Sequence, residues 1–345
     1  MAGVKPILVI KFGTASITRS TGEPDEDIIG EIARQVAILH LDYRVILVSS
    51  GAVGAGKAHI VDYRGTLTQR KAAAAVGNPL LIGLYARYFL PYQIPIAQSL
   101  CERQHFANRH QFLQLKNTYE ELWQSGIIPI VNENDVVSDR ELKFSDNDEL
   151  ATLIATGFGA EALMLCTSVG GLMDDEGRIV REVQTVNDVF KWVRTGKSDL
   201  GLGGMASKLT FTKLATRMGI SVVIFGMSEP DGLIRALKKE VGTAFPAQKS
   251  TLSARSRWLG SGGLVVGQLR IDEGAVRALK NRKSLLAVGI LDVQGEFESG
   301  ELVEIFDPNH EMVAVARARE TSQAILNNLR TLNFEVANAS DIVLL

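Results

Sequence analysis

The chain has 345 residues, of which 46% are hydrophobic and 22% are charged, and its formal net charge is −2. This length is sufficient for two domains, and the composition is that of an ordinary globular protein. The small net charge gives no bulk electrostatic reason to bind nucleic acid or an anionic membrane.

The first predicted element is a short, apolar and β-branched strand, Ile7 to Ile10. It ends at Lys11, which is followed by a glycine turn at Gly13. An ammonium group next to backbone N–H groups that a ligand can approach closely suits a phosphate. Apolar residues at helical spacing then predict a helix from Asp27 to His40.

A second buried strand, Val45 to Val48, precedes the glycine-rich stretch Ser49 to Lys57. The stretch almost matches a P-loop, but Ala58 stands where that motif needs a hydroxyl for magnesium, so we exclude a P-loop. Two interpretations stay open. The turn could bind an anion at a helix start, with Ser50 adding a hydroxyl, or its glycines could serve tight helix–strand packing.

Helical composition covers residues 68–90, and we expect a break around Gly77-Asn78-Pro79. Residues 94–97 predict a short strand, and residues 112–122 an amphipathic helix. Residues 127–131 form a third apolar run that predicts a buried strand.

Two polar clusters follow that strand, Asn132-Glu133-Asn134-Asp135 and Ser145-Asp146-Asn147-Asp148. Open α/β sheets bind ligands outside the carboxyl ends of their strands, which favours a polar substrate held through its amine and carboxylates. The alternative is a turn rich in Asn and Asp, which these residues favour for local reasons.

A helix at 148–156 and a strand at 162–166 come next, and the strand ends at Thr167-Ser168. Residues 174–177 predict a hairpin turn. The glycine-rich segment Gly201 to Met205 then leads into a helix that carries Lys208. This is a second phosphate-type pattern, for which the alternative is a flexible linker.

A strand at 221–225 and a helix at 231–239 complete the alternation, which predicts a mostly parallel sheet covered by helices on both faces. From residue 264 short strands dominate, at 264–266, 285–288, 302–306 and 313–316, with one short helix at 274–279. We therefore expect a catalytic α/β domain at 1–247, a linker at 248–263 and a small β-rich domain at 264–345.

These residues resemble the glutamate 5-kinases of the amino acid kinase superfamily. The resemblance covers almost the whole chain, and its most specific part is Asn132-Glu133-Asn134-Asp135. The segment Arg270 to Ala275 resembles the start of a PUA domain, an RNA-binding-type module. The resemblance implies the amino acid kinase fold followed by a PUA-like domain.

The resemblance also implies the reaction, which is transfer of the γ-phosphoryl group of ATP, with Mg²⁺, to the side-chain carboxylate of L-glutamate in proline biosynthesis. Carried over, Lys11 and Lys208 are catalytic, and Asp148 orients them. The implied glutamate-binding residues are Ser50, Asp135 and Asn147. The implied nucleotide-binding residues are Lys11, Thr167, Ser168, Gly201, Leu202, Gly203, Gly204, Met205 and Lys208.

The chain departs from the family pattern at three positions. Ser168 replaces a common Asp, Ser145 a common Gly, and Leu202 a common Thr. The departures at Ser168 and Leu202 affect the expected preference and affinity for the nucleotide. None removes a residue assigned to phosphoryl transfer.

Three alternatives remain: a kinase of another small acid such as acetylglutamate or aspartate, an inactive regulator, and an RNA-binding protein that uses the PUA-like domain. Asp135 argues against N-acylated substrates, which lack a positive amine. Residues 258–345 contain eight Lys and Arg against twelve Asp and Glu, which argues against RNA as a partner.

The resemblance further implies a homo-oligomer, a dimer or tetramer, with proline as an inhibitor. The two cysteines, Cys101 and Cys166, are too few for a disulfide framework, which favours a cytoplasmic protein. No apolar run reaches the ~20 residues of a membrane helix. The five histidines show no metal-ligand spacing, so we expect no metal held by protein ligands alone.

Overall fold

The computed structural model describes residues 4–102, 105–106, 109–137, 147–192, 204–248, 265–297, 299–300 and 302–344. The chain divides into two compact units. The first comprises Met1–Glu102 with Gln114–Ser250, and the second Arg103–Leu113 with Thr251–Leu345. Among the described residues no helix is both long and apolar enough to cross a bilayer.

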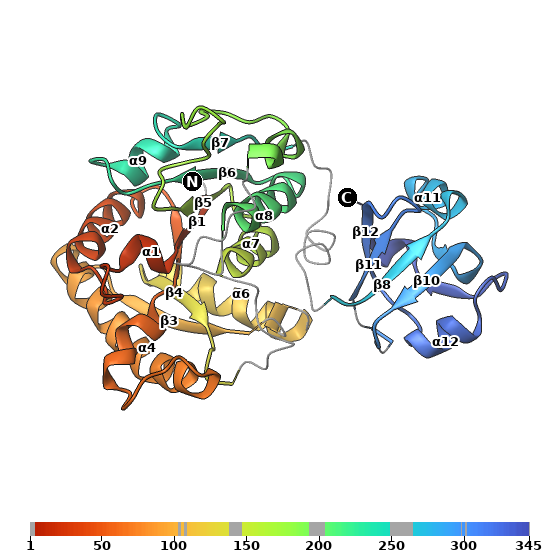
Figure 1. The fold of residues 1–345 in the computed structure, drawn as a ribbon, viewed down its shortest axis with the longest axis horizontal. Coiled ribbons are helices and arrows are strands. Elements are labelled where there is room, and N and C mark those ends of the chain that lie inside the picture. Colours follow the sequence, from red (N-terminus) through yellow and green to blue (C-terminus); the bar gives the residue numbers. More distant parts are fainter. Residues whose placement is uncertain are drawn as a thin grey trace. The chain divides into compact units, whose positions relative to one another are not determined.

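A seven-stranded sheet forms the centre of the first unit, in the order β3-β4-β2-β1-β5-β6-β7 (Figure 1). Its strands are parallel except β7, which runs antiparallel to β6. The strands are β1 (Ile7–Phe12), β2 (Arg44–Ser49), β3 (Ile96–Cys101), β4 (Ile128–Glu133), β5 (Ala162–Cys166), β6 (Ser221–Phe225) and β7 (Thr243–Phe245).

Helices cover both faces of this sheet, as the sequence predicted. One face packs its apolar side chains, such as Ile10 and Phe12 of β1, against α2, α4 and α9. The other face is covered by α6, α7 and α8 (Figure 1). The helices are α1 (Thr14–Ile17), α2 (Glu26–Leu39), α3 (Ala52–Gly56), α4 (Leu67–Phe89), α6 (Arg109–Gln124), α7 (Asn147–Phe158), α8 (Met205–Arg217) and α9 (Gly232–Leu237).

The predicted break at Gly77-Asn78-Pro79 is wrong, because α4 continues through all three residues. Proline has no backbone N–H, so Pro79 cannot donate the helical hydrogen bond to the carbonyl of Ala75, four residues earlier. Both Pro79 and Ala75 are exposed, so water can satisfy the carbonyl. Tertiary packing of the opposite side of α4, including Tyr85, sustains the helix.

The glycine-rich stretch after β2 serves close packing. A Cβ at Gly56 would lie 1.9 Å from the carbonyl oxygen of Ala73, and a Cβ at Gly54 would lie 2.4 Å from that of Gly22. The helix that follows, α3, has only five residues. Tight packing therefore accounts for these two glycines. Gly56 packs α3 against α4, and Gly54 packs α3 against the loop before α2, so neither contact is the helix–strand contact that the sequence suggested.

The second unit is built on a five-stranded sheet in the order β10-β8-β11-β12-β14 and a two-stranded sheet, β13-β9 (Figure 1). The β-rich prediction is confirmed, but the expectation of a single helix is wrong, because a second helix forms after the Thr321 cap. The elements are β8 (Val265–Ile271), α11 (Glu273–Lys280), β9 (Leu285–Leu286), β10 (Ile290–Gln294), β11 (Leu302–Phe306), β12 (Met312–Arg317), α12 (Ser322–Asn327), β13 (Glu335–Ala337) and β14 (Ile342–Leu344). Most of the predicted linker, 249–263, lies outside the described residues.

Candidate active site

Three charged side chains from distant parts of the chain meet at the carboxyl end of β1. The ammonium group of Lys11 lies 2.6 Å from Oδ1 of Asp148, and that of Lys208 donates to Oδ2 of the same carboxylate at 2.7 Å. All three residues are buried: Lys11 is 4% exposed, Asp148 0% and Lys208 5%. The structure therefore brings together the three side chains to which the family resemblance assigns catalysis.

The backbone explains why they converge. Lys11 alternates with Ile10 and Phe12, so it points to the sheet face that α7 and α8 cover. Asp148 lies in the first turn of α7, and Lys208 in the first turn of α8.

Burial alone would raise the pKa of Asp148, but the charges of Lys11 and Lys208 outweigh burial and hold that pKa below its ordinary value. The carboxylate therefore stays ionised near neutral pH. Two ammonium groups and one carboxylate leave an excess of positive charge in a site from which water is largely excluded. Such a group favours a bound anion, and its attraction is stronger than it would be in water.

A chain of hydrogen-bonded side chains lies at the carboxyl ends of β2 and β4. Nδ2 of Asn147 donates to Oγ of Ser50 at 2.8 Å and to Oδ1 of Asn132 at 3.0 Å. Nδ2 of Asn132 donates to Oδ1 of Asn78 at 3.0 Å, and the backbone N–H of Glu133 donates to Oδ1 of Asn132 at 2.9 Å. Both amide hydrogens of Asn147 are thus engaged.

This direction of donation sets what the site can recognise. Ser50 accepts from Asn147, so its own hydroxyl hydrogen remains for an acceptor such as a carboxylate. The Oδ1 atom of Asn147 remains for a donor such as an ammonium group. A donor and an acceptor side by side suit the two charged groups of an amino acid.

Asp135 lies in the turn after β4 and is half-buried, at the same edge of the sheet. The neighbouring Asn134 donates to Oε1 of Glu102 at 2.9 Å, which ties this turn to the end of β3. The sequence analysis assigned no individual role to Asn132 or Asn78. Asn132 stood in a visible polar cluster, whereas Asn78, which lies 54 residues earlier, was noted only as part of a predicted helix break.

Thr167 and Ser168 directly follow β5, on the other side of β1 from β2. The N–H of Thr167 donates to the carbonyl of Phe225 at 2.7 Å. A Cβ at Gly226 would lie 2.8 Å from the Cα of Gly170, so glycine permits the loops after β5 and β6 to approach closely.

Gly204 is the N-cap of α8, and Met205 is the first residue of that helix. A Cβ at Gly204 would meet no described atom within 4 Å. The N-terminus of α8 lies one turn or less from Lys208, and helix N-termini favour anions. The predicted nucleotide residues Gly201, Leu202 and Gly203 lie outside the described residues.

The order of the strands separates the predicted roles in space. The amide chain belongs to β4 and β2, Lys11 ends the central strand β1, and Thr167 follows β5 on the opposite side. The connection after β1 leads to β2 on one side, and the connection after β5 leads to β6 on the other side. Open α/β sheets form their ligand crevice at such a switch point.

The described residues do not form a magnesium cage. Among them, no three His, Cys, Asp or Glu side chains cluster in a way that could hold a metal ion. Both oxygens of Asp148 face lysine ammonium groups instead. Magnesium in nucleotide sites is commonly held largely by phosphates and water, and a site of that kind needs no cage of protein carboxylates.

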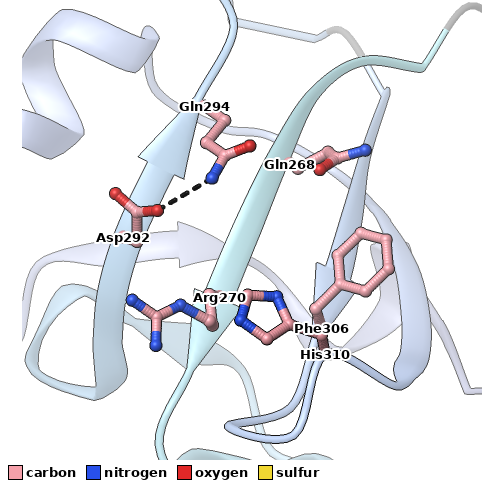
Figure 2. Close-up of a pocket in the computed structure, with 6 residues that line it drawn as sticks. All are labelled: Gln268, Arg270, Asp292, Gln294, Phe306 and His310. Atoms are coloured by element: carbon pink, nitrogen blue, oxygen red, sulfur yellow. Dashed lines mark hydrogen bonds between the residues drawn. The ribbon is translucent and has the colours of Figure 1, made fainter.

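A separate pocket of about 80 Å³ lies on β8, β10 and β11 of the second unit (Figure 2). Arg270 and Asp292 are cross-strand neighbours on its floor, and Figure 2 shows the Arg270 side chain extending towards β10. The pocket lacks a lysine and a glycine loop, so its chemistry does not suit phosphoryl transfer. Its lining residues are Gln268, Arg270, Asp292, Gln294, Phe306 and His310.

Comparison with known proteins agrees with this geometry. Residues 6–226 match the amino acid kinase family, and residues 267–330 match the PUA domain. The carbamate kinase of Giardia lamblia bound to AMP-PNP has a TM-score of 0.52 at 15% identity, covering 71% of this chain and 99% of that one. At this identity the similarity shows the shared fold.

Relatives at higher identity are named glutamate 5-kinase. The protein of Gloeobacter violaceus is 40% identical over 314 residues, which cover 87% of this chain and 85% of that protein. The protein of Synechococcus sp. (strain JA-3-3Ab) is 38% identical over 340 residues, which cover 95% and 90%.

Proposed function

The chain belongs to the amino acid kinase family and, within it, to the glutamate 5-kinases, and we propose that Lys11, Asp148 and Lys208 form its phosphoryl-transfer centre. The enzyme transfers a phosphoryl group from ATP to the side-chain carboxylate of L-glutamate, in proline biosynthesis. The observation that supports the proposed centre is the placement of two buried lysines from β1 and α8 on the two oxygens of one carboxylate.

Phosphoryl transfer asks the protein mainly for positioning and for positive charge around the transferring group. Asp148 supplies the positioning, because one ionised carboxylate fixes both ammonium groups. Since an ammonium carries three hydrogens, each lysine can hold Asp148 and also approach a phosphoryl oxygen. Lys11 and Lys208 would thus stabilise the charge that spreads over these oxygens in the transition state.

The attacking group needs no general base, because the side chain of glutamate is already a carboxylate at neutral pH. We propose that Ser50, Asp135 and Asn147 bind glutamate. The Ser50 hydroxyl would donate to a substrate carboxylate, and Oδ1 of Asn147 and the Asp135 carboxylate would accept from the α-ammonium group. An N-acylated substrate has no such cation, so acetylglutamate should be a poor substrate.

We propose that Thr167, Ser168 and the segment ending at Gly204 and Met205 bind ATP. The positive end of the α8 dipole, at its N-terminus, would favour its phosphates. Mg²⁺ would enter on those phosphates and neutralise part of their charge.

Inhibition by proline, a homo-oligomeric state and a cytoplasmic location are also proposals, supported by family membership. Both cysteines are free thiols in the structure, as a reducing compartment would require.

The test of the proposed centre is Lys208→Ala, with ADP release from MgATP and L-glutamate as the measurement. The matched control is Lys238→Ala, which removes an exposed lysine beyond the end of α9. We expect kcat to fall by a factor of about 1,000 in Lys208→Ala, as for loss of a group that stabilises transition-state charge, and to stay unchanged in the control. A kcat within tenfold of the parent would contradict the proposal.

The RNA alternative has a direct test as well. The PUA domain is present, but its acidic balance does not favour binding to phosphates. A gel shift with transfer RNA at several salt concentrations should show weak binding only. Tight, salt-sensitive binding would revive an RNA role.

A further inference from the structure

Asn78 is a buried amide in the middle of α4, a helix to which neither the sequence nor the proposed mechanism assigns a functional residue. Its side chain is 6% exposed, and its Oδ1 accepts from Nδ2 of Asn132. Asn132 is also buried, at 7% exposure. The backbone N–H of Glu133 can only donate, and it donates to Oδ1 of Asn132, so Nδ2 is the end of the Asn132 amide that needs the acceptor on Asn78.

The orientation of Asn132 determines that of Asn147. With Nδ2 of Asn132 directed at Asn78, its Oδ1 faces Asn147 and accepts a hydrogen bond from it. If the Asn132 amide turned over, it would present hydrogens to Asn147, and Asn147 would have to turn its own oxygen inward. The Asn147 amide would then direct N–H groups towards the substrate ammonium, which is a repulsive arrangement.

The same turn of α4 also supports Ser50. A Cβ at Gly77 would lie 1.7 Å from the carbonyl oxygen of Ala52, so the absence of a side chain lets α4 approach α3 closely. Ala52 is the first residue of α3, two positions after Ser50. Gly77 therefore packs behind the loop that carries Ser50, while Asn78 packs behind Asn132.

We infer that Asn78 is a positioning residue for glutamate: it holds the amide chain in the one direction that leaves an acceptor on Asn147 and a donor on Ser50. The inference rests on the proposed binding of glutamate by Asn147 and Ser50. Gly77 and Asn78 lie inside α4, where the sequence pattern predicted a break, and their packing behind Ser50 and Asn132 gives both residues a role. Asn78 acts through Asn132, without touching the substrate.

The test compares substitutions that keep or remove the acceptor. Asn78→Leu preserves the approximate size and removes the acceptor, and Asn78→Asp preserves an oxygen that can accept from Asn132. Gln98→Ala is the matched control, because Gln98 of β3 lines a small pocket together with Asn78 and Asn132. Asn147→Ala tests the underlying site. For every variant the KM for glutamate, the KM for ATP, kcat and the thermal unfolding temperature are measured.

We expect Asn78→Leu to raise the KM for glutamate about tenfold, which corresponds to about 1.4 kcal/mol, as for a buried donor left without its acceptor. The KM for ATP and kcat should stay within about twofold, a split that general structural damage would not give. Asn78→Asp should restore most of the affinity, and Gln98→Ala should match the parent. If the leucine variant does not fold, Asn78→Ala removes the same acceptor and is judged by the same values.

The results distinguish failure of the role inferred for Asn78 from failure of the proposed glutamate site. If Asn147→Ala leaves the KM for glutamate unchanged, the proposed glutamate site is wrong, and the inference fails with it. If Asn147→Ala raises this KM but folded Asn78→Leu or Asn78→Ala does not, only the inference is overturned. An equal rise in both KM values would also overturn it.

Discussion

Replacement of Asp148 by asparagine removes the charge that holds two buried ammonium groups together while keeping the shape of the side chain. In the parent, the Lys11 and Lys208 ammonium groups lie 2.6 and 2.7 Å from the two carboxylate oxygens. In Asp148→Asn, two buried positive charges face each other across a neutral amide. We therefore expect the variant to lose both stability and activity.

The stability loss can be estimated from measured buried ion pairs. Removing one partner of such a pair costs about 3–5 kcal/mol, because an uncompensated buried charge remains. For a unit of roughly 250 residues, each kcal/mol shifts the unfolding temperature by about 2–4 °C. We expect the first unit of Asp148→Asn to unfold about 10 °C below the parent at pH 7.

The pH dependence has a definite sign. The pKa of Asp148 is lower in the folded protein than its ordinary value of 3.8. The ionised carboxylate therefore contributes its stability at pH values above about 3.8, and this contribution is lost as the pH falls through the lower folded pKa. The difference between parent and variant should be constant near neutral pH and should shrink below about pH 3.8.

Differential scanning calorimetry measures this difference directly. The control is Asp42→Asn, which makes the same chemical change at an exposed turn and should leave the unfolding temperature unchanged. Adding Lys208→Met to Asp148→Asn removes one of the two uncompensated charges and should recover part of the loss. An Asp148→Asn protein that unfolds within 2 °C of the parent would refute the reasoning.

Three further predictions follow from the packing and the site. Gly77→Ala should destabilise the protein by about 1–3 kcal/mol or more, because its Cβ would overlap a backbone oxygen. Gly83→Ala in the same helix should stabilise the protein by about 0.5–1 kcal/mol through helix propensity, because its Cβ would meet no described atom within 4 Å; chemical denaturation compares the two variants. Ser50→Ala should raise the KM for glutamate about tenfold and leave the KM for ATP unchanged; a rise in the KM for ATP alone would count against the assigned role. Acetylglutamate should be turned over at least 100-fold less efficiently than glutamate, since it has no ammonium group; comparable kcat/KM values for the two would argue against the role of Asp135 and Asn147.

Much of the fold follows from short-range patterns in the sequence. Apolar runs such as Val45 to Val48 can only be buried strands in this context, and the helix caps and glycine turns between them are local signals. The error at Pro79 has a physical reason as well. Proline penalises a helix locally, but packing of Tyr85 and its neighbours against the sheet outweighs one lost hydrogen bond.

The site was predictable only in part. Local glycine patterns marked Lys11 and Lys208 as phosphate-type signals, but only the family resemblance joined them with Asp148. No spacing rule connects β1, α7 and α8, and Asp148 and Lys208 lie 60 positions apart. Asn78 gave no signal, since an amide inside a helix has a role only through a neighbour that folding brings to it. Polar chains of this kind are specified by tertiary structure and leave little trace in one sequence.

The central claim is that phosphoryl transfer to glutamate occurs at the Lys11–Asp148–Lys208 centre. The most direct measurement is the amount of acyl phosphate that the enzyme forms from MgATP and L-glutamate, trapped with hydroxylamine, in the parent and in Lys11→Met. We predict glutamate-dependent hydroxamate formation by the parent and a decrease of at least about 100-fold in a folded Lys11→Met protein. Hydroxamate formation by Lys11→Met at the rate of the parent would contradict the claim.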